Sequence, residues 1–416
     1  MYNPAPNVKT LIPIFDLQER DRRWKRLRER MQQAQLDCII GFPNSGHWDQ
    51  FQAGLRYITQ IGGNTTEVAV VFPLDGETTA FVRGPNEVAW WGSQSEWIPD
   101  LQTTGRSWAQ PVIQSLRAKG LANKRIGVIG LTGSVRSPEG LVPSGIVDAL
   151  RAELPEAKLV SADDVVNRCR SAKSPAEVEF QRNACHVAER AAQTMIEMAR
   201  PGVPEREVFG AMLRTIVVEG GEIMAMLHWG SGPLPPWPHR LVTNRVLEAG
   251  DVINNEIESK WSGYVAQVVQ PMVLGQPEQW MQDCFDTSRR IFDELRAAIR
   301  PGAAVASVVE LYQQRVKEAG YVAGAALMHG RGLGEDPPLV HGRGNVDPAL
   351  RFEEGNVFIL KPAVFPPQGD VVVSETGQVT ELAVRTGDTV VVTASGAERL
   401  GRRPLEIATP ASSWRV

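Results

Sequence analysis

Residues 174–203 read SPAEVEFQRNACHVAERAAQTMIEMARPGV, and this stretch sets the architecture of the second half of the chain. Ser174 stands in the N-cap position, Pro175 at the first helical position and Glu177 three residues after the serine. Together these residues predict a helix start with a capping box. The predicted helix runs to about Ala199, where the Arg-Pro-Gly of residues 200–202 ends it.

The same pattern recurs about 100 residues later, where IFDELRAAI is followed by RPGA at 300–303 and then by ASVVELYQQRVKEAGY. Each copy continues into a histidine-bearing loop and then into a strand, DVINNEIE at 251–258 and NVFILKPAV at 356–364. Two αα-β-β units related by duplication are therefore predicted, with a pseudo-twofold axis between them and a site where they meet. The alternative is a chance resemblance between two helix stops.

The first half predicts a separate α/β domain, because short apolar strands at 37–42, 67–72, 78–82 and 125–131 alternate with helical patterns. The predicted class is α+β, with an N-terminal α/β domain at 1–167 and a second domain at 168–416. The 44 basic and 48 acidic residues leave a charge of −4, which argues against a nucleic-acid partner. Four scattered cysteines indicate buried thiols. No signal peptide or apolar span is evident, so we expect a cytoplasmic protein without membrane contact.

The loop SGPLPPWPH before His239 is the first candidate for chemistry. Its prolines and glycine make it stiff, and Trp229 just before it and Trp237 within it indicate the walls of a pocket. A histidine on a loop is often only solvated, and each tryptophan on its own is more often core.

Acidic and basic side chains also stand in otherwise apolar strands. Glu256 and Glu258 project to one side of their strand, and so form either a solvent face or a buried site. Lys361 ends a wholly apolar strand and must find an anionic partner or lower its pKa. The glycine-rich loop between them carries further candidates, which a surface loop with incidental charges would also explain: His329, Arg331, His341 and Arg343.

These motifs in this order resemble the creatinase, aminopeptidase P and prolidase family, which has the pita-bread fold. The resemblance rests on RSAKSPAEVEFQRNA, HRLVTNRVLEAGDVI, GYVAQVVQPMVLG, MHGRGL and EEGNVFILKPAVF, among others, and covers nearly the full chain. It implies a creatinase-like N-terminal domain followed by a pita-bread catalytic domain. It also implies a homodimer, in which the N-terminal domain of one subunit helps to close the other subunit's site.

The family's metal ligands do not carry over. Metal-dependent members hold two divalent ions with two Asp, one His and two Glu, and the five matching positions here are Glu256, Gln267, His329, Lys361 and Gly387. Glu256 and Lys361 sum to zero charge, which two dications would not tolerate. We therefore expect no metal and no cofactor.

The resemblance implies a metal-independent, creatinase-like hydrolase or lyase. It would cleave a non-peptide C–N bond in a small aromatic or carboxylated metabolite. His239 matches the family's catalytic histidine and would be the general acid/base, with Lys361, Glu256, Glu258 and His329 beside it. Arg331, Arg343, His341, Trp237 and Trp229 would bind substrate. Two alternatives are a non-catalytic binding protein on the same scaffold and an Xaa-Pro peptidase-like enzyme with a degenerate metal site.

Overall fold

The computed structural model describes residues 11–44, 52–63, 66–132, 137–223, 227–237, 241–367, 372–373, 379–380 and 382–413. The chain divides into two compact units. Unit 1 comprises residues 1–171 together with the short segment 333–337, and unit 2 comprises the remainder. The boundary that the sequence predicts at 167/168 falls inside the last helix of unit 1, α6 (Asp163–Ser171).

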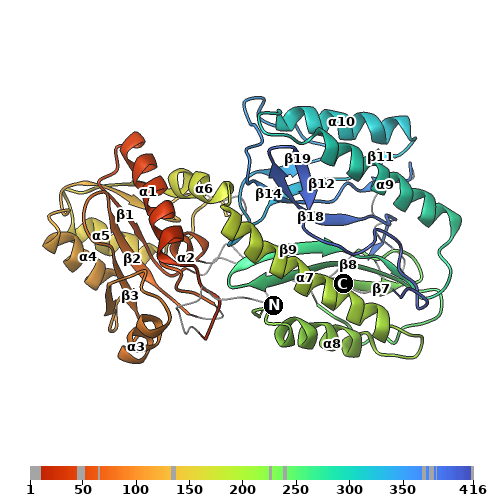
Figure 1. Ribbon diagram of the computed structural model, residues 1–416, viewed down its shortest axis with the longest axis horizontal. Helices are drawn as coiled ribbons and strands as arrows, with labels where there is room; N and C mark the ends of the chain where they lie inside the picture. Colours follow the sequence, from red (N-terminus) through yellow and green to blue (C-terminus); the bar gives the residue numbers. More distant parts are fainter. Residues whose placement is uncertain are drawn as a thin grey trace. The chain divides into compact units, whose positions relative to one another are not determined.

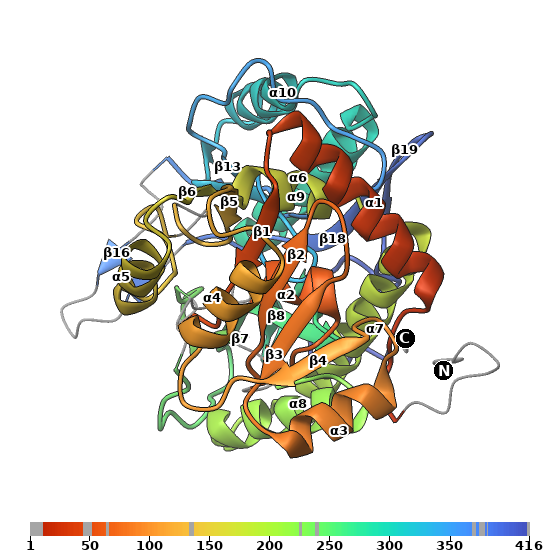
Figure 2. The same cartoon turned by 90° about the vertical axis from the view of Figure 1, so that its left-hand side faces the viewer.

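Unit 1 is a six-stranded mixed sheet with helices on both faces, in agreement with the predicted α/β domain. The strand order is β4-β3-β2-β1-β5-β6, with β1 antiparallel to β2 and parallel to β5. Figure 2 looks onto this unit and shows its helices around the sheet. Besides α6, its elements are α1 (Leu17–Gln33), β1 (Cys38–Gly41), α2 (Ala53–Thr59), β2 (Ala69–Pro73), β3 (Thr79–Val82), α3 (Pro85–Gln94), β4 (Asp100–Thr103), α4 (Ala109–Ala118), β5 (Arg125–Val128), α5 (Ser144–Glu153) and β6 (Lys158–Ser161).

Successive residues of a strand face opposite sides of this sheet, and different helices cover the two sides. Val71 of β2 lies in the cluster formed with α4 and α5, whereas the next residue, Phe72, meets the ring of Trp24 on α1 at 5.5 Å. The stretch at 87–97 carries three tryptophans, of which two belong to the core. Trp91 and Trp97 are buried, whereas Trp90 is 42% exposed.

Unit 2 is built on a nine-stranded sheet with two long helix pairs, as Figure 1 shows. The main strand order is β10-β8-β9-β18-β14-β12-β13, with β7 paired to β8 and β19 to β18. The helices are α7 (Pro175–Met198), α8 (Glu205–Val218), α9 (Gln279–Ala298) and α10 (Val305–Glu318). The strands of this sheet are β7 (Leu227–Gly232), β8 (Val252–Trp261), β9 (Tyr264–Val269), β10 (Met272–Val273), β12 (Ala326–Gly330), β13 (Leu339–His341), β14 (Val357–Leu360), β18 (Gly387–Thr393) and β19 (Gly396–Arg399). Two short two-stranded sheets add β11 (Val322–Ala323), β15 (Val364–Phe365), β16 (Val372–Val373) and β17 (Val379–Thr380).

The predicted capping box and internal repeat are both confirmed. The Ser174 side chain accepts from the Glu177 N–H, and Glu177 accepts from the Ser174 N–H. At the first helix stop, the Gly202 N–H donates to the Leu247 carbonyl at 2.8 Å. At the second, the Gly302 N–H donates to the Phe352 carbonyl at the same distance.

The strand entrances repeat as well. The Glu248 N–H donates to the Asp251 carboxylate, and the Glu353 N–H donates to the Asn356 amide oxygen, both at 2.8 Å. Each helix pair also packs a core of its own, α7 and α8 on β8 and β9, and α9 and α10 on β12 and β14. Both features are those expected of two copies of one unit.

Two further expectations concern the chain as a whole. All four cysteines are buried thiols, as predicted. None of the described helices is both long enough and apolar enough to cross a membrane.

Candidate functional site

A row of buried charged side chains lies on one face of the central sheet of unit 2. Glu256 and Glu258 extend from β8, and Glu258 stands opposite Gln267 of the neighbouring strand β9. Lys361 directly follows β14, and its N–H pairs with Leu327 of β12 at 2.9 Å. Opposed residues on paired strands share a face, so the register brings these side chains together.

Glu256 is the centre of this row. Its Oε1 accepts from the Lys361 ammonium at 2.7 Å and lies 3.5 Å from Arg385. Its Oε2 accepts from the Gln267 amide at 2.8 Å and lies 3.3 Å from His228 Nδ1. Both carboxylate oxygens are therefore held from two sides, which fixes the orientation of the group.

The surroundings of Glu256 keep it ionised. Burial alone would raise its pKa, but the Lys361 ammonium, with His228 and Arg385 beside it, holds that pKa well below its usual range. The carboxylate is a fixed negative charge at neutral pH, and Lys361 is the cation that compensates it.

Glu258 belongs to a second ion pair, joined to the first. The guanidinium of Arg331 donates to Glu258 Oε1 and, at 3.0 Å, to Gln267 Oε1. Gln267 thus links the two pairs, since its amide nitrogen donates to Glu256. Arg331 is almost fully buried and compensates Glu258; its role in substrate binding stays a prediction.

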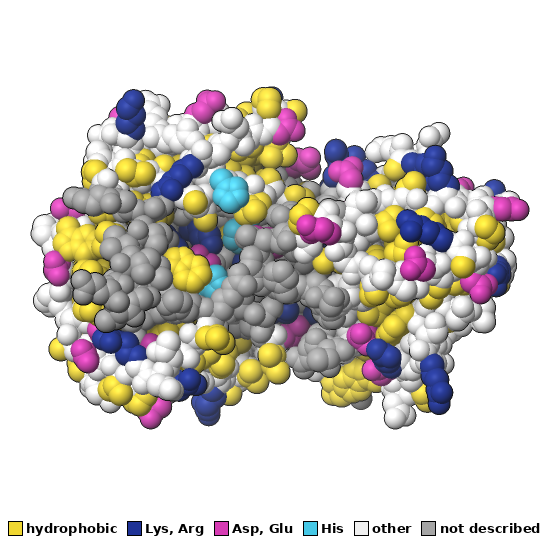
Figure 3. All heavy atoms as spheres, turned by 180° about the vertical axis from the view of Figure 1, so that it is seen from behind, with side chains coloured by type: hydrophobic (Ala, Val, Ile, Leu, Met, Phe, Trp, Pro, Cys, Tyr) yellow, Lys and Arg dark blue, Asp and Glu magenta, His cyan; other side chains and the backbone are white. Residues whose placement is uncertain are grey.

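Arg331 and Arg385 add two cations to the Lys361–Glu256 pair expected from the sequence. Lys361, Arg331 and Arg385 contact the carboxylates of Glu256 and Glu258. Seen from behind in Figure 3, unit 2 has a recess in which histidine side chains lie beside acidic and basic ones.

The donor set at the family's metal positions does not fit a pair of divalent ions. Such ions need several anionic or carbonyl oxygens, but the Lys361 ammonium points at the one carboxylate that remains, Glu256. The last family position is also closed to a ligand. A Cβ built at Gly387 would lie 2.8 Å from Lys361 Cβ and 2.7 Å from Val269 Cγ2. Within the described ranges, no group of three His, Cys, Asp or Glu side chains is arranged to hold a metal ion.

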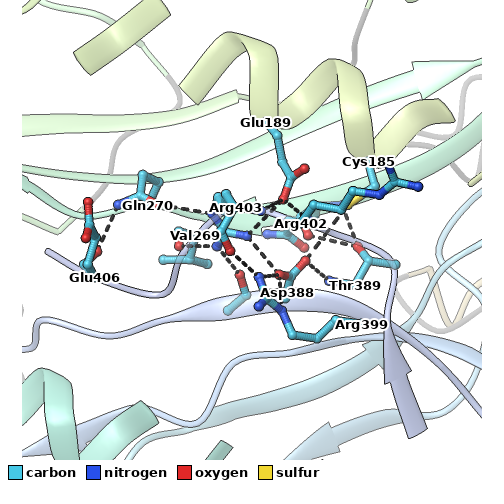
Figure 4. Close-up of polar contacts among 12 residues, drawn as sticks. Cys185, Glu189, Val269, Gln270, Asp388, Thr389, Arg399, Arg402, Arg403 and Glu406 are labelled. Carbon is cyan, nitrogen blue, oxygen red and sulfur yellow. Dashed lines mark hydrogen bonds and ion pairs between the residues drawn. The ribbon is translucent and has the colours of Figure 1, made fainter. Parts of the chain in front are cut away.

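Asp388, the residue after Gly387, belongs to a separate buried network (Figure 4). Its Oδ2 accepts from Arg403 at 2.8 Å and from Arg399 at 2.9 Å. Glu189 of α7 accepts from the Arg403 N–H at 2.8 Å, and burial raises the pKa of Glu189. These contacts tie residues 399–403 to β18 and α7, so Asp388 serves the structure of the unit.

Of the remaining predicted residues, His329 lies near the row, and His341 and Arg343 lie at the surface. His329 is buried on β12, opposite Ile359, on the same face as Lys361. His341 and Arg343 are exposed, and Arg343 lies over the ring of Phe365, 5.9 Å from its centroid. His239, the predicted general acid/base, lies outside the described residues.

The two predicted tryptophans have different surroundings. Trp229 is 1% exposed, its indole N–H donates to Glu205 at 3.1 Å, and its ring packs edge-on to Phe209. Trp229 is thus a core residue that only borders a small cavity with Pro236, because both its ring and its N–H are already engaged. Trp237 is 42% exposed and precedes the undescribed residues 238–240.

The row also contains two residues that were not predicted from the sequence, His228 and Arg385. His228 stands opposite Glu256 in the β7–β8 register. The alternation of LHWGSG around His228 is the one sequence signal that pointed to it. Arg385 comes from the segment before β18, and nothing in its sequence neighbourhood separates it from a surface arginine.

Comparison with known proteins defines the class. The model of metallopeptidase family M24 matches residues 179–394, a little over half of the chain, and the creatinase/prolidase N-terminal domain matches residues 23–172. The chain has the two-domain pita-bread architecture of a hydrolytic enzyme. It belongs to metallopeptidase family M24.

The relatives are peptidases by name. The Xaa-Pro dipeptidase of Pyrococcus furiosus is 24% identical over 272 residues, which covers 65% of this chain and 74% of that protein. The probable dipeptidase PepE of Mycobacterium tuberculosis is 27% identical over 253 residues, 60% of this chain and 63% of that protein. An Xaa-Pro dipeptidase from Bacillus anthracis has the same fold, with a TM-score of 0.74, 18% identity, and coverage of 94% of this chain and 99% of that chain.

These relatives correct the function expected from the sequence. A creatinase-like enzyme for non-peptide C–N bonds is wrong as the leading interpretation, because the relatives are named for peptide hydrolysis. The predicted family and the predicted class of enzyme, a hydrolase, are both supported. The lost metal ligands are few side chains at the site, and they do not change the peptidase family to which the rest of the chain belongs.

Proposed function

We propose that this protein hydrolyses the C–N bond of small peptides of the Xaa-Pro class, with its own charged side chains in place of two divalent ions. Membership of the M24 family and the names of its relatives support the peptide substrate. The observation that carries the proposal is the Lys361–Glu256 pair at 2.7 Å, which puts an ammonium where the family pattern has a metal ligand.

The charge balance of the row suits this reaction. Attack on a peptide carbonyl develops negative charge on its oxygen, and fixed cations in a site of low dielectric stabilise that charge strongly. Lys361 and Arg385 both lie beside Glu256 Oε1, at 2.7 and 3.5 Å.

Peptide hydrolysis further requires a group that moves protons between water and the leaving nitrogen. His329 lies buried on the same face as Lys361. His239 stays a prediction for this role, because the structure does not describe it.

The test is turnover of a panel of Xaa-Pro dipeptides by purified protein, followed as release of free proline. We expect activity to persist after dialysis against a chelator, and added Mn²⁺, Co²⁺ or Zn²⁺ to leave it unchanged. Xaa-Ala dipeptides serve as the substrate control. Elemental analysis of the same preparation should find no stoichiometric divalent metal.

The outcomes separate the parts of the proposal. Activity that appears only after metal is added would reject the metal-independent site and keep the peptidase. Absence of turnover for every peptide would reject the peptidase and favour a binding protein, which calorimetry with the same dipeptides would then reveal.

A further inference from the structure

His228 forms a pair with Glu256 that neither the sequence motifs nor the family positions single out. The two residues stand opposite each other on β7 and β8, and His228 Nδ1 lies 3.3 Å from Glu256 Oε2. The side chain of His228 is 13% exposed and that of Glu256 is 9% exposed. The contact is thus largely shielded from water.

The state of Glu256 decides which nitrogen of His228 carries the proton. Glu256 accepts from the Lys361 ammonium at 2.7 Å and from the Gln267 amide at 2.8 Å, as a carboxylate does. A carboxylate only accepts hydrogen bonds, so Nδ1 must be the nitrogen that carries the proton. The lone pair is then on Nε2, as in other histidines that a carboxylate orients.

Lys361 makes this arrangement rigid. Lys361 Nζ donates to Glu256 Oε1 at 2.7 Å, while His228 Nδ1 contacts the other oxygen of the carboxylate, Oε2. Gln267 adds a second donor to Oε2, at 2.8 Å. Rotation of the carboxylate would break all three contacts, so the direction of the imidazole ring is set by the sheet.

The far nitrogen of the ring is the atom available for chemistry. His228 Nε2 is buried and has no hydrogen-bond partner among the described residues. Leaving a buried polar atom unsatisfied costs about 1–3 kcal/mol, so such an atom requires an explanation, and a catalytic role is one of those known. We expect the hydrogen-bond partner of Nε2 to be a water molecule or a group of the substrate.

We propose that His228 is the proton-transfer residue of this site and that Glu256 is its positioning residue. Nε2 takes a proton from water as the water oxygen bonds to the substrate carbonyl carbon. The C–N bond then breaks, and the same proton passes from Nε2 to the leaving nitrogen, which yields a carboxylic acid and an amine. This inference rests on the proposed hydrolytic function.

Kinetics of His228 variants test the inference. His228→Gln keeps a polar side chain but cannot transfer a proton, so we expect kcat to fall about 10²–10⁴-fold with little change in KM. His228→Ala should lose as much and regain activity when imidazole is added, which a merely structural loss would not do. Glu256→Gln should lower kcat in the same direction. The matched control is His186→Gln, on the exposed side of α7, which should behave as wild type.

Activity near the wild-type level in His228→Gln would overturn the inference. So would loss of activity in His239→Ala combined with full activity in His228→Gln. Either result leaves the proposed function standing, because the wild-type protein remains active.

Nitrogen NMR of histidine-labelled protein gives a readout that needs no turnover. We expect the His228 resonance, assigned by its loss in His228→Gln, to show the tautomer protonated at Nδ1, and Glu256→Gln to abolish that preference. A neutral imidazole protonated at Nε2 would refute the pair. If the wild-type protein cleaves no peptide, the proposed function fails, and this measurement still decides the arrangement of His228 and Glu256.

Discussion

At the residue scale, the stability of the site depends on Lys361 as the partner of Glu256. Lys361→Met keeps the length of the side chain but leaves a buried carboxylate without its ammonium at 2.7 Å. We expect the free energy of unfolding to fall by about 3 kcal/mol, at the low end for a broken buried pair because Arg385 remains. Urea denaturation measures this. The double variant Lys361→Met with Glu256→Gln should recover most of the loss, and failure to do so would show that the charge is not the cause.

Acid should weaken the same site. A carboxyl group with a lowered folded pKa, such as Glu256, contributes stability that is present above its unfolded pKa and is lost as the pH falls through the folded value. We therefore expect wild-type stability to decline below about pH 4.3, the ordinary value for Glu. The Lys361→Met, Glu256→Gln variant should decline less over that range. Equal slopes for the two proteins would contradict the assignment.

At the scale of elements, the two helix stops of unit 2 should respond alike to one substitution. Gly202 and Gly302 have φ of 90° and 83°, and a Cβ at either would meet nothing within 4 Å. Alanine there introduces backbone strain alone, so Gly202→Ala and Gly302→Ala should each cost roughly 1–2 kcal/mol. Gly210, inside α8 and equally open, is the control. Alanine at that position should stabilise by up to about 1 kcal/mol. Costs that differ widely between the two stops would contradict their equivalence.

At the scale of the whole molecule, the homodimer stays a prediction that rests on the family resemblance. The stretch at 87–97 does not add to it, because Trp91 and Trp97 are buried within unit 1. Sedimentation velocity at micromolar concentration should nevertheless give twice the mass of one chain, as the family resemblance implies. A species with the mass of a single chain would refute the prediction.

Patterns that act over short distances were readable from the sequence. The capping box at Ser174, the helix stops at 200–202 and 300–302 and the duplicated units all depend on neighbouring residues, so spacing alone predicts them. The need of Lys361 for an anion followed from its apolar strand. The ordered motifs along the chain were enough to place it in its family.

Only the tertiary structure decided which charges meet. Strand register, which no single sequence displays, puts His228 opposite Glu256 and Glu258 opposite Gln267. Arg331 looks like a ligand-binding arginine in its glycine-rich loop, yet folding brings it onto Glu258, 73 residues away along the chain. Ion pairs of this kind form between strands distant in sequence, because a buried charge is tolerated only where the fold supplies its partner.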